Sequence, residues 1–216
     1  NVGQAASYTV IGFVFLYAVD AIWLIPGFVL SMSFGSIVSQ PMWLSLSRRF
    51  GKERCYVAGS LGWAAVTVTW FFLRPGDDVL VTLPLVGPLA TQHVLVLVRG
   101  VFIGVVNSGF VLLALSMLTD TVDYQRRTFG QAHEGVFSGL FSAAEKLAFA
   151  VGPLLGGIIL SLFDFHSSTG GAAAQSPRAI TGILLLYSFI PAGAQVLSLL
   201  LFTRYRLDPA KAVRRF

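Results

Sequence analysis

The sequence alternates between long apolar stretches and short polar segments. A helix needs roughly 20 apolar residues to cross a bilayer core about 30 Å thick. We therefore predict an all-α membrane protein with spans over residues 1–18 (partial), 25–46, 55–73, 93–118, 134–163 and 179–203. Only Asp20 and Pro26 mark the boundary between the first two spans. Segment 79–92 is apolar but short and contains Pro and Gly, so it either extends the fourth span or lies at the membrane interface.

The composition supports a membrane protein and excludes several other classes. Hydrophobic residues make up 55% of the chain and charged residues 12%, whereas a soluble domain carries about 25% charged residues. So few charges cannot cover a soluble surface, which excludes an ordinary soluble enzyme, a disordered chain and a nucleic-acid binder. The lipid bilayer is therefore an expected partner, and nucleic acid is not.

The positive charges predict the orientation in the membrane. Of the 15 Lys and Arg residues, 11 lie within 48–54, 126–127 and 204–215, which fall on one side if the spans alternate. Only Arg74 and Arg178 fall on the other side. Because cytoplasmic loops carry an excess of Lys and Arg, we expect the basic side and the C-terminus to face the cytoplasm, with the protein in the plasma (inner) membrane.

Signals for enzymatic chemistry are missing from the sequence. The single cysteine, Cys55, permits no internal disulfide, and no zinc, phosphate-loop or dinucleotide motif occurs. We predict no catalytic residue, no metal site and no cofactor. The chain begins at Asn1, within apolar sequence and without a signal-peptide pattern. We therefore expect it to be the C-terminal part of a longer protein, cut inside a span.

Polar residues inside the predicted spans are candidates for a solute cavity. Lys146 lies in the middle of the fifth span, and Ser138 and Ser142 precede it at four-residue spacing, which forms one polar stripe on a helix. An ionisable group at this depth costs about 2.5–3.5 kcal/mol and normally faces protein or water. Lys146 therefore either lines a cavity or is neutralised in a structural ion pair.

Two further polar residues lie in the fourth span. Arg99 could line the cavity or extend to the membrane interface. Asn107 could bind a polar solute or bond a neighbouring helix. Small residues recur at four-residue spacing, which favours close helix packing over ligand contact; they are Gly100, Gly104 and Ser108, then Gly135 and Gly139, then Gly152 and Gly156.

The predicted connector 119–133 is the densest polar segment. Its mixed charges could form a network that holds one conformational state and opens in another, or they could be a solvated loop. The candidate residues for such a cytoplasmic gate are Asp120, Asp123, Tyr124, Arg126 and Arg127.

Three motifs in order resemble one transporter family. Pro41-Met42-Trp43 leading into Arg48–Arg54, Ser116–Tyr124, and Glu145-Lys146-Leu147 followed by Gly152–Gly157 resemble segments of the glycoside–pentoside–hexuronide:cation symporters, the melibiose permease group of the major facilitator superfamily. Together the motifs cover about residues 41–160.

The resemblance implies the C-terminal six-helix half of a twelve-helix transporter that carries a sugar or glycoside with sodium or protons by alternating access. It places the coupling-cation carboxylates mainly in the absent N-terminal half, which is an expected partner. Lys146 matches the family lysine near the sugar and cation sites, and Asp120, Asp123 and Tyr124 match the gate signature. Arg99 and the apolar turn between the first two spans depart from the family pattern.

Two other functions fit the same pattern. One is a major facilitator carrier of a lipid-like or organic-anion solute. The other is a non-transporting membrane scaffold, which the cost of burying Lys146 disfavours.

Overall fold

The computed structural model describes residues 2–73, 79–83, 87–129, 134–166 and 174–202. Helix α1 (Val2–Phe13) continues into a π-helical turn, Val14–Ala18. Helix α2 (Ile25–Phe50) follows a short 3-10 turn, Ile22–Leu24. The α1–α2 break lies where Asp20 and Pro26 predicted it, and Asp20 has a positive φ of 55°. The amide of Gln92 bonds the freed carbonyls of Ala18 and Val19, both at 3.4 Å.

Gly51 alone separates α2 from α3 (Lys52–Val68). Its φ of 88° is open to glycine but strained for other residues. The predicted basic connector 48–54 is therefore mostly helix, formed by the end of α2 and the start of α3. A 3-10 turn, Thr69–Phe72, ends this span.

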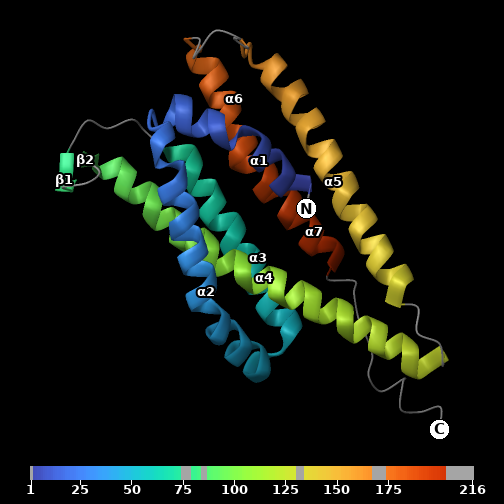
Figure 1. The fold of residues 1–216 in the computed structure, drawn as a ribbon. Coiled ribbons are helices and arrows are strands. Elements are labelled where there is room, and N and C mark those ends of the chain that lie inside the picture. The colour runs from blue at the N-terminus through green and yellow to red at the C-terminus, as the bar shows by residue number, and fades with distance from the viewer. Residues whose placement is uncertain (1, 74–78, 84–86, 130–133, 167–173, 203–216) are drawn as a thin grey trace.

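The chain then forms a strand pair that the apolar pattern of the sequence does not predict. Strands β1 (Val79–Leu83) and β2 (Gly87–Ala90) pair antiparallel in a small hairpin (Figure 1). Segment 79–92 is thus mainly this hairpin, and only its last two residues begin helix α4 (Thr91–Phe129).

Helix α4 extends beyond the fourth span predicted at 93–118. It runs for 39 residues, so Thr119–Phe129 is helix and the connector predicted at 119–133 is shorter than expected. At 1.5 Å per residue, α4 is about 58 Å long, which is well over the thickness of the bilayer core, about 30 Å. The polar gate candidates therefore lie on a helix that continues past its apolar part.

The last three helices complete the bundle. They are α5 (Glu134–Leu162), α6 (Pro177–Tyr187) and α7 (Phe189–Phe202). Helix α5 packs mainly against α1 and lies at the edge of the bundle (Figure 1). Of the described residues, five helical segments are long and apolar enough to cross a membrane, and Gly3–Ala18 is a shorter apolar helix. The predicted C-terminal tail lies outside the described residues.

Glycines set how closely the helices approach. A Cβ at Gly104 would clash with the backbone of Met32 on α2, and one at Gly152 with the backbone of Ala5 and Ala6 on α1. The predicted packing role is confirmed at these positions. Gly135 and Gly139 on α5 instead meet no other described atom within 4 Å.

Aromatic side chains fill the centre of the core. Trp70 is fully buried, and its ring lies 4.9 Å from Tyr187 and 5.4 Å from Phe28, measured between centroids. This cluster joins α2, α6 and the end of the α3 span. Two of its members, Phe28 and Tyr187, also border the smaller of the two cavities described next.

Candidate functional site

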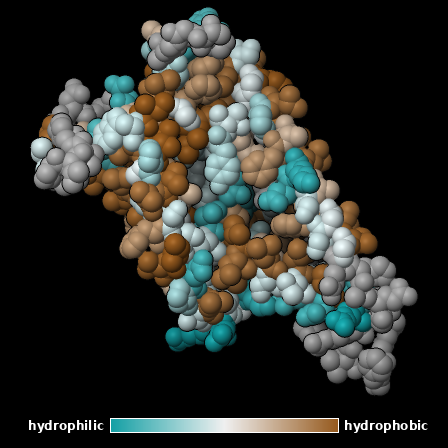
Figure 2. Space-filling view, in the orientation of Figure 1, coloured by the Kyte–Doolittle hydropathy of each residue, from teal (hydrophilic) through white to brown (hydrophobic). Residues whose placement is uncertain are grey.

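Two cavities share one bordering amide side chain, that of Gln4. The small cavity, about 180 Å³, is bordered by α1, α2, α3, α4 and α6, and includes Tyr8, Phe28, Trp63 and Thr67. The large cavity, about 640 Å³, lies between α4 and α5, with contributions from α1, α3 and α7. In Figure 2 the middle of the visible face carries pale and teal residues between hydrophobic ridges.

Gln4 borders both cavities. Its Nε2 donates a 3.0 Å hydrogen bond to Oδ1 of Asn107, which borders the small cavity. The bond joins α1 to α4. The bond to a neighbouring helix that the sequence left open for Asn107 is therefore present in the structure, whereas its binding of a solute stays a prediction.

The polar stripe of α5 is exposed. Ser138, Ser142 and Lys146 all face outward on this helix, and none of them borders either of these two cavities. Lys146 follows Glu134 by twelve residues, about 18 Å along the helix axis. Its mid-helix depth agrees with the sequence prediction, whereas its role in solute binding stays a prediction.

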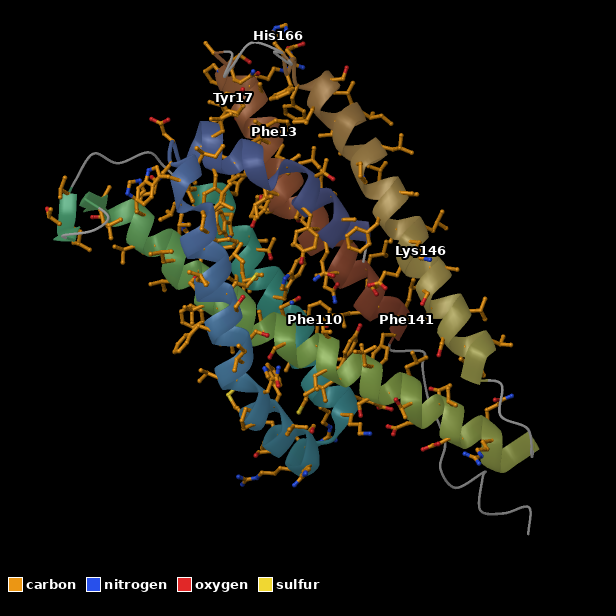
Figure 3. The ribbon with its side chains drawn as sticks, viewed as in Figure 1. Phe13, Tyr17, Phe110, Phe141, Lys146 and His166 are labelled. Carbon is orange, nitrogen blue, oxygen red and sulfur yellow. The ribbon has the colours of Figure 1, made fainter. Side chains whose placement is uncertain are left out.

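Glu145 brings a carboxylate to the large cavity, although it precedes Lys146 by only one residue. The same cavity is bordered by Phe141 of α5 and Phe110 of α4, and Figure 3 shows these two side chains on neighbouring helices with Lys146 further along α5. Neighbouring positions on a helix point about 100° apart. Both side chains are exposed, but only Glu145 borders the large cavity.

Arg99 lies against the end of α3. Its Nε donates to Oγ1 of Thr69 at 3.2 Å and its Nη2 to the Thr69 carbonyl at 3.3 Å. The guanidinium also lies over the ring of Trp70, 5.9 Å from its centroid. A cation at a helix C-terminus is favourable. These contacts tie α4 to α3 and leave Arg99 outside both cavities described here.

One of the gate candidates forms an ion pair. Nζ of Lys52, in the first turn of α3, lies 2.6 Å from a carboxylate oxygen of Asp120 on α4. Asp123 and Arg126 are exposed on the following turns, and Tyr124 is partly buried. The side chain of Arg127 lies outside the described residues. The structure thus joins the gate segment to the Gly51 turn.

Sequence reasoning did not select Gln4 or Thr67. Gln4 is an amide in an otherwise apolar stretch, and this signal alone could have indicated it. Thr67 resembles any helical threonine in the sequence, because nothing local shows that its hydroxyl faces a cavity.

Comparison with known proteins identifies the family. The model of the MFS/sugar transport protein family matches residues 2–209, nearly the whole chain. The chain belongs to this family. It is therefore a helical membrane protein of the major facilitator superfamily, a superfamily of transporters rather than enzymes.

Relatives within the family are named as transporters. The isoprimeverose transporter of Lactiplantibacillus pentosus is 31% identical over 111 residues, which cover 50% of this chain and 22% of that protein. An uncharacterized symporter of Synechocystis is 25% identical over 153 residues, covering 70% of this chain and 25% of that protein. An uncharacterized symporter of Bacillus subtilis is 27% identical over 96 residues, covering 44% of this chain and 20% of that protein.

The matched part is thus about a quarter or less of the length of these relatives. No solved structure matches the chain.

Proposed function

We propose that this chain is the C-terminal half of a symporter that moves a sugar or glycoside with sodium or protons. The solute binds near the middle of the membrane, between this half and an N-terminal half, and one half rocks against the other to alternate access. Family membership and the names of the relatives support this proposal. The basic ends of α2 and α3 and the C-terminus face the cytoplasm, and the protein lies in the plasma membrane.

The observation that carries the proposal is the polar face at the middle of α5. Lys146 is exposed there, and only 22% of the most apolar stretch of this helix is buried in the described structure. A lysine facing lipid at this depth would be costly, so its face meets protein or water in the membrane. A second half that completes the cavity supplies this environment.

Lys146 and Glu145 then have complementary tasks. The ammonium of Lys146 cannot bind a cation, but it can hold a carboxylate of the N-terminal half or donate hydrogen bonds to a sugar hydroxyl. The carboxylate of Glu145, at the large cavity, can accept a hydrogen bond from the solute. Most of the coupling-cation ligands are expected in the N-terminal half.

The test is uptake by Lys146 variants of the full-length protein. Lys146→Ala removes the charge from an exposed position, so surface expression stays near normal while cation-dependent uptake is lost. Lys146→Arg restores little, because a planar guanidinium replaces a compact ammonium. Leu140→Ala, at an exposed apolar position of the same helix that borders neither cavity described here, is the control and retains most uptake. Full coupled uptake by Lys146→Ala would contradict the role of this residue.

The exposed ammonium also favours a second candidate, transport of an organic anion. Competition in the same uptake assay distinguishes the two candidates. An excess of neutral sugar inhibits uptake of the labelled solute if the protein carries sugars. An excess of an organic anion inhibits this uptake if Lys146 binds the charge of the solute.

A further inference from the structure

The small cavity contains a buried hydroxyl without a partner. Thr67 is 3% exposed and borders the cavity, and its Oγ1 has no hydrogen-bond partner within the described part of the chain. Buried polar groups are nearly always hydrogen-bonded, and an exception calls for a specific explanation such as a bound molecule.

Other threonines show that this orientation is unusual here. Threonine hydroxyls in helices commonly bond the carbonyl three or four residues earlier. Five helical threonines of this chain do so, namely Thr9, Thr69, Thr119, Thr121 and Thr181. The hydroxyl of Thr67 makes no such bond, which leaves its donor and its acceptor for the cavity.

Aromatic, aliphatic and amide groups form the rest of the lining; the aliphatic side chains are Ile11, Val29, Met32 and Ile103. Trp63, one helical turn before Thr67, and Phe28 of α2 supply aromatic surface. The Gln4–Asn107 pair lies at the border with the large cavity. Each amide carries two N–H donors and a carbonyl acceptor, more than the one bond between them uses.

Size and charge narrow the class of ligand. None of the side chains that border the small cavity belongs to Asp, Glu, Lys or Arg, so a charged solute would be buried without a counter-charge. A cavity of about 180 Å³ is large enough for a group the size of one sugar ring. The lining is mainly apolar, so the apolar C–H faces of a pyranose would pack on the aromatic and aliphatic walls. The few hydroxyl and amide groups of the lining would bond some of the hydroxyls on its rim.

We propose that the small cavity is a binding subsite for a single neutral sugar ring. Thr67 and the Gln4–Asn107 pair hydrogen-bond its hydroxyls, and Trp63 packs on its apolar face. The entrance lies between α1 and α2, where Tyr8 is 50% and Val29 is 44% exposed. This subsite rests on the proposed sugar transport, and it places one ring of the solute within this half of the protein.

The first test removes the hydroxyl alone. Thr67→Val keeps the shape of the side chain, and the loss of one hydrogen bond raises the Kd for D-xylose or D-glucose about threefold to tenfold. Binding is measured by isothermal titration on the full-length protein in detergent. Because replacing an unpartnered buried hydroxyl with an apolar group costs little stability, the melting temperature stays the same or rises.

A matched control separates binding from packing. Ser60 lies two turns earlier on the same helix, is 0% exposed, has a hydroxyl without a partner in the described residues, and does not border the small cavity. Ser60→Ala therefore leaves the Kd unchanged. An equal loss of affinity in both variants would overturn the assignment of Thr67 to the subsite.

A second variant closes the entrance. Val29→Trp changes an exposed position, so the protein folds normally while the bulky ring blocks entry and weakens binding at least tenfold. Unchanged affinity in both Thr67→Val and Val29→Trp would show that the cavity holds only water and would overturn the subsite alone. A wild-type protein that binds and transports no sugar would overturn the proposed function as well.

Discussion

At the scale of single residues, the polar side chains of the spans have different surroundings. Lys146 is exposed on α5, Asn107 borders the small cavity, and Arg99 bonds Thr69 at the end of the α3 span. Lys146 and Asn107 were found because charged and amide groups are rare at that depth. Arg99 was found in the same way, yet its contacts with Thr69 and Trp70 come from a neighbouring helix that spacing cannot reveal. Thr67 was missed because a free hydroxyl is visible only in three dimensions.

The Lys52–Asp120 pair gives a prediction at this scale. The two side chains are 40% and 49% exposed, so the pair adds little stability, at most about 1 kcal/mol. We expect the pair to hold the cytoplasmic side closed. Loss of the pair in Asp120→Asn therefore shifts the full-length protein toward the inward-facing state, while its melting temperature barely changes. The measurement is alkylation of a cysteine placed at Ala144, which borders the large cavity.

The control for this prediction is Glu53→Gln, which removes a negative charge next to Lys52 but leaves the ion pair intact. Alkylation should change in Asp120→Asn and stay constant in Glu53→Gln. Reversal of the pair, with Lys52→Asp and Asp120→Lys combined, should restore the original alkylation rate. A constant rate in all three proteins would indicate a solvated surface pair.

At the scale of elements, the number and order of the spans follow from apolar length, whereas the connections do not. Gly51 makes the α2–α3 turn in one residue, and α4 continues to Phe129 because Thr119–Phe129 contains no Pro or Gly to end it. The hairpin depends on antiparallel pairing between β1 and β2. The length of an apolar stretch indicates whether it can cross the lipid, but it carries no information on pairing between strands.

Two glycines, one packed against a neighbouring helix and one without a described neighbour, give a prediction about stability. Gly104→Ala forces a Cβ into the backbone of Met32, so α2 and α4 must separate, which costs about 1–3 kcal/mol. Gly139→Ala on α5 meets no described atom and gains helix propensity, about 0.5–1 kcal/mol. Thermal unfolding in detergent should show a lower melting temperature for the first variant and an equal or higher one for the second. Equal destabilisation by both would contradict the close α2–α4 crossing.

At the scale of the whole molecule, the orientation rests on charge asymmetry alone. Arg49→Cys at the end of α2 and Ala174→Cys before α6 place exposed thiols at the two predicted sides, and native Cys55 is buried. In intact cells a membrane-impermeant maleimide should label the Ala174→Cys variant and spare the Arg49→Cys variant. Labelling of the Arg49→Cys variant from outside would reverse the topology.

The central claim is that solute movement is coupled to a cation. The most direct measurement is uptake of radiolabelled sugar into proteoliposomes that contain the full-length protein, with and without an inward sodium or proton gradient. If transport is symport, one gradient drives accumulation above the external concentration, and Lys146→Ala abolishes this accumulation. Uptake that only equilibrates, whichever gradient is applied, would contradict symport.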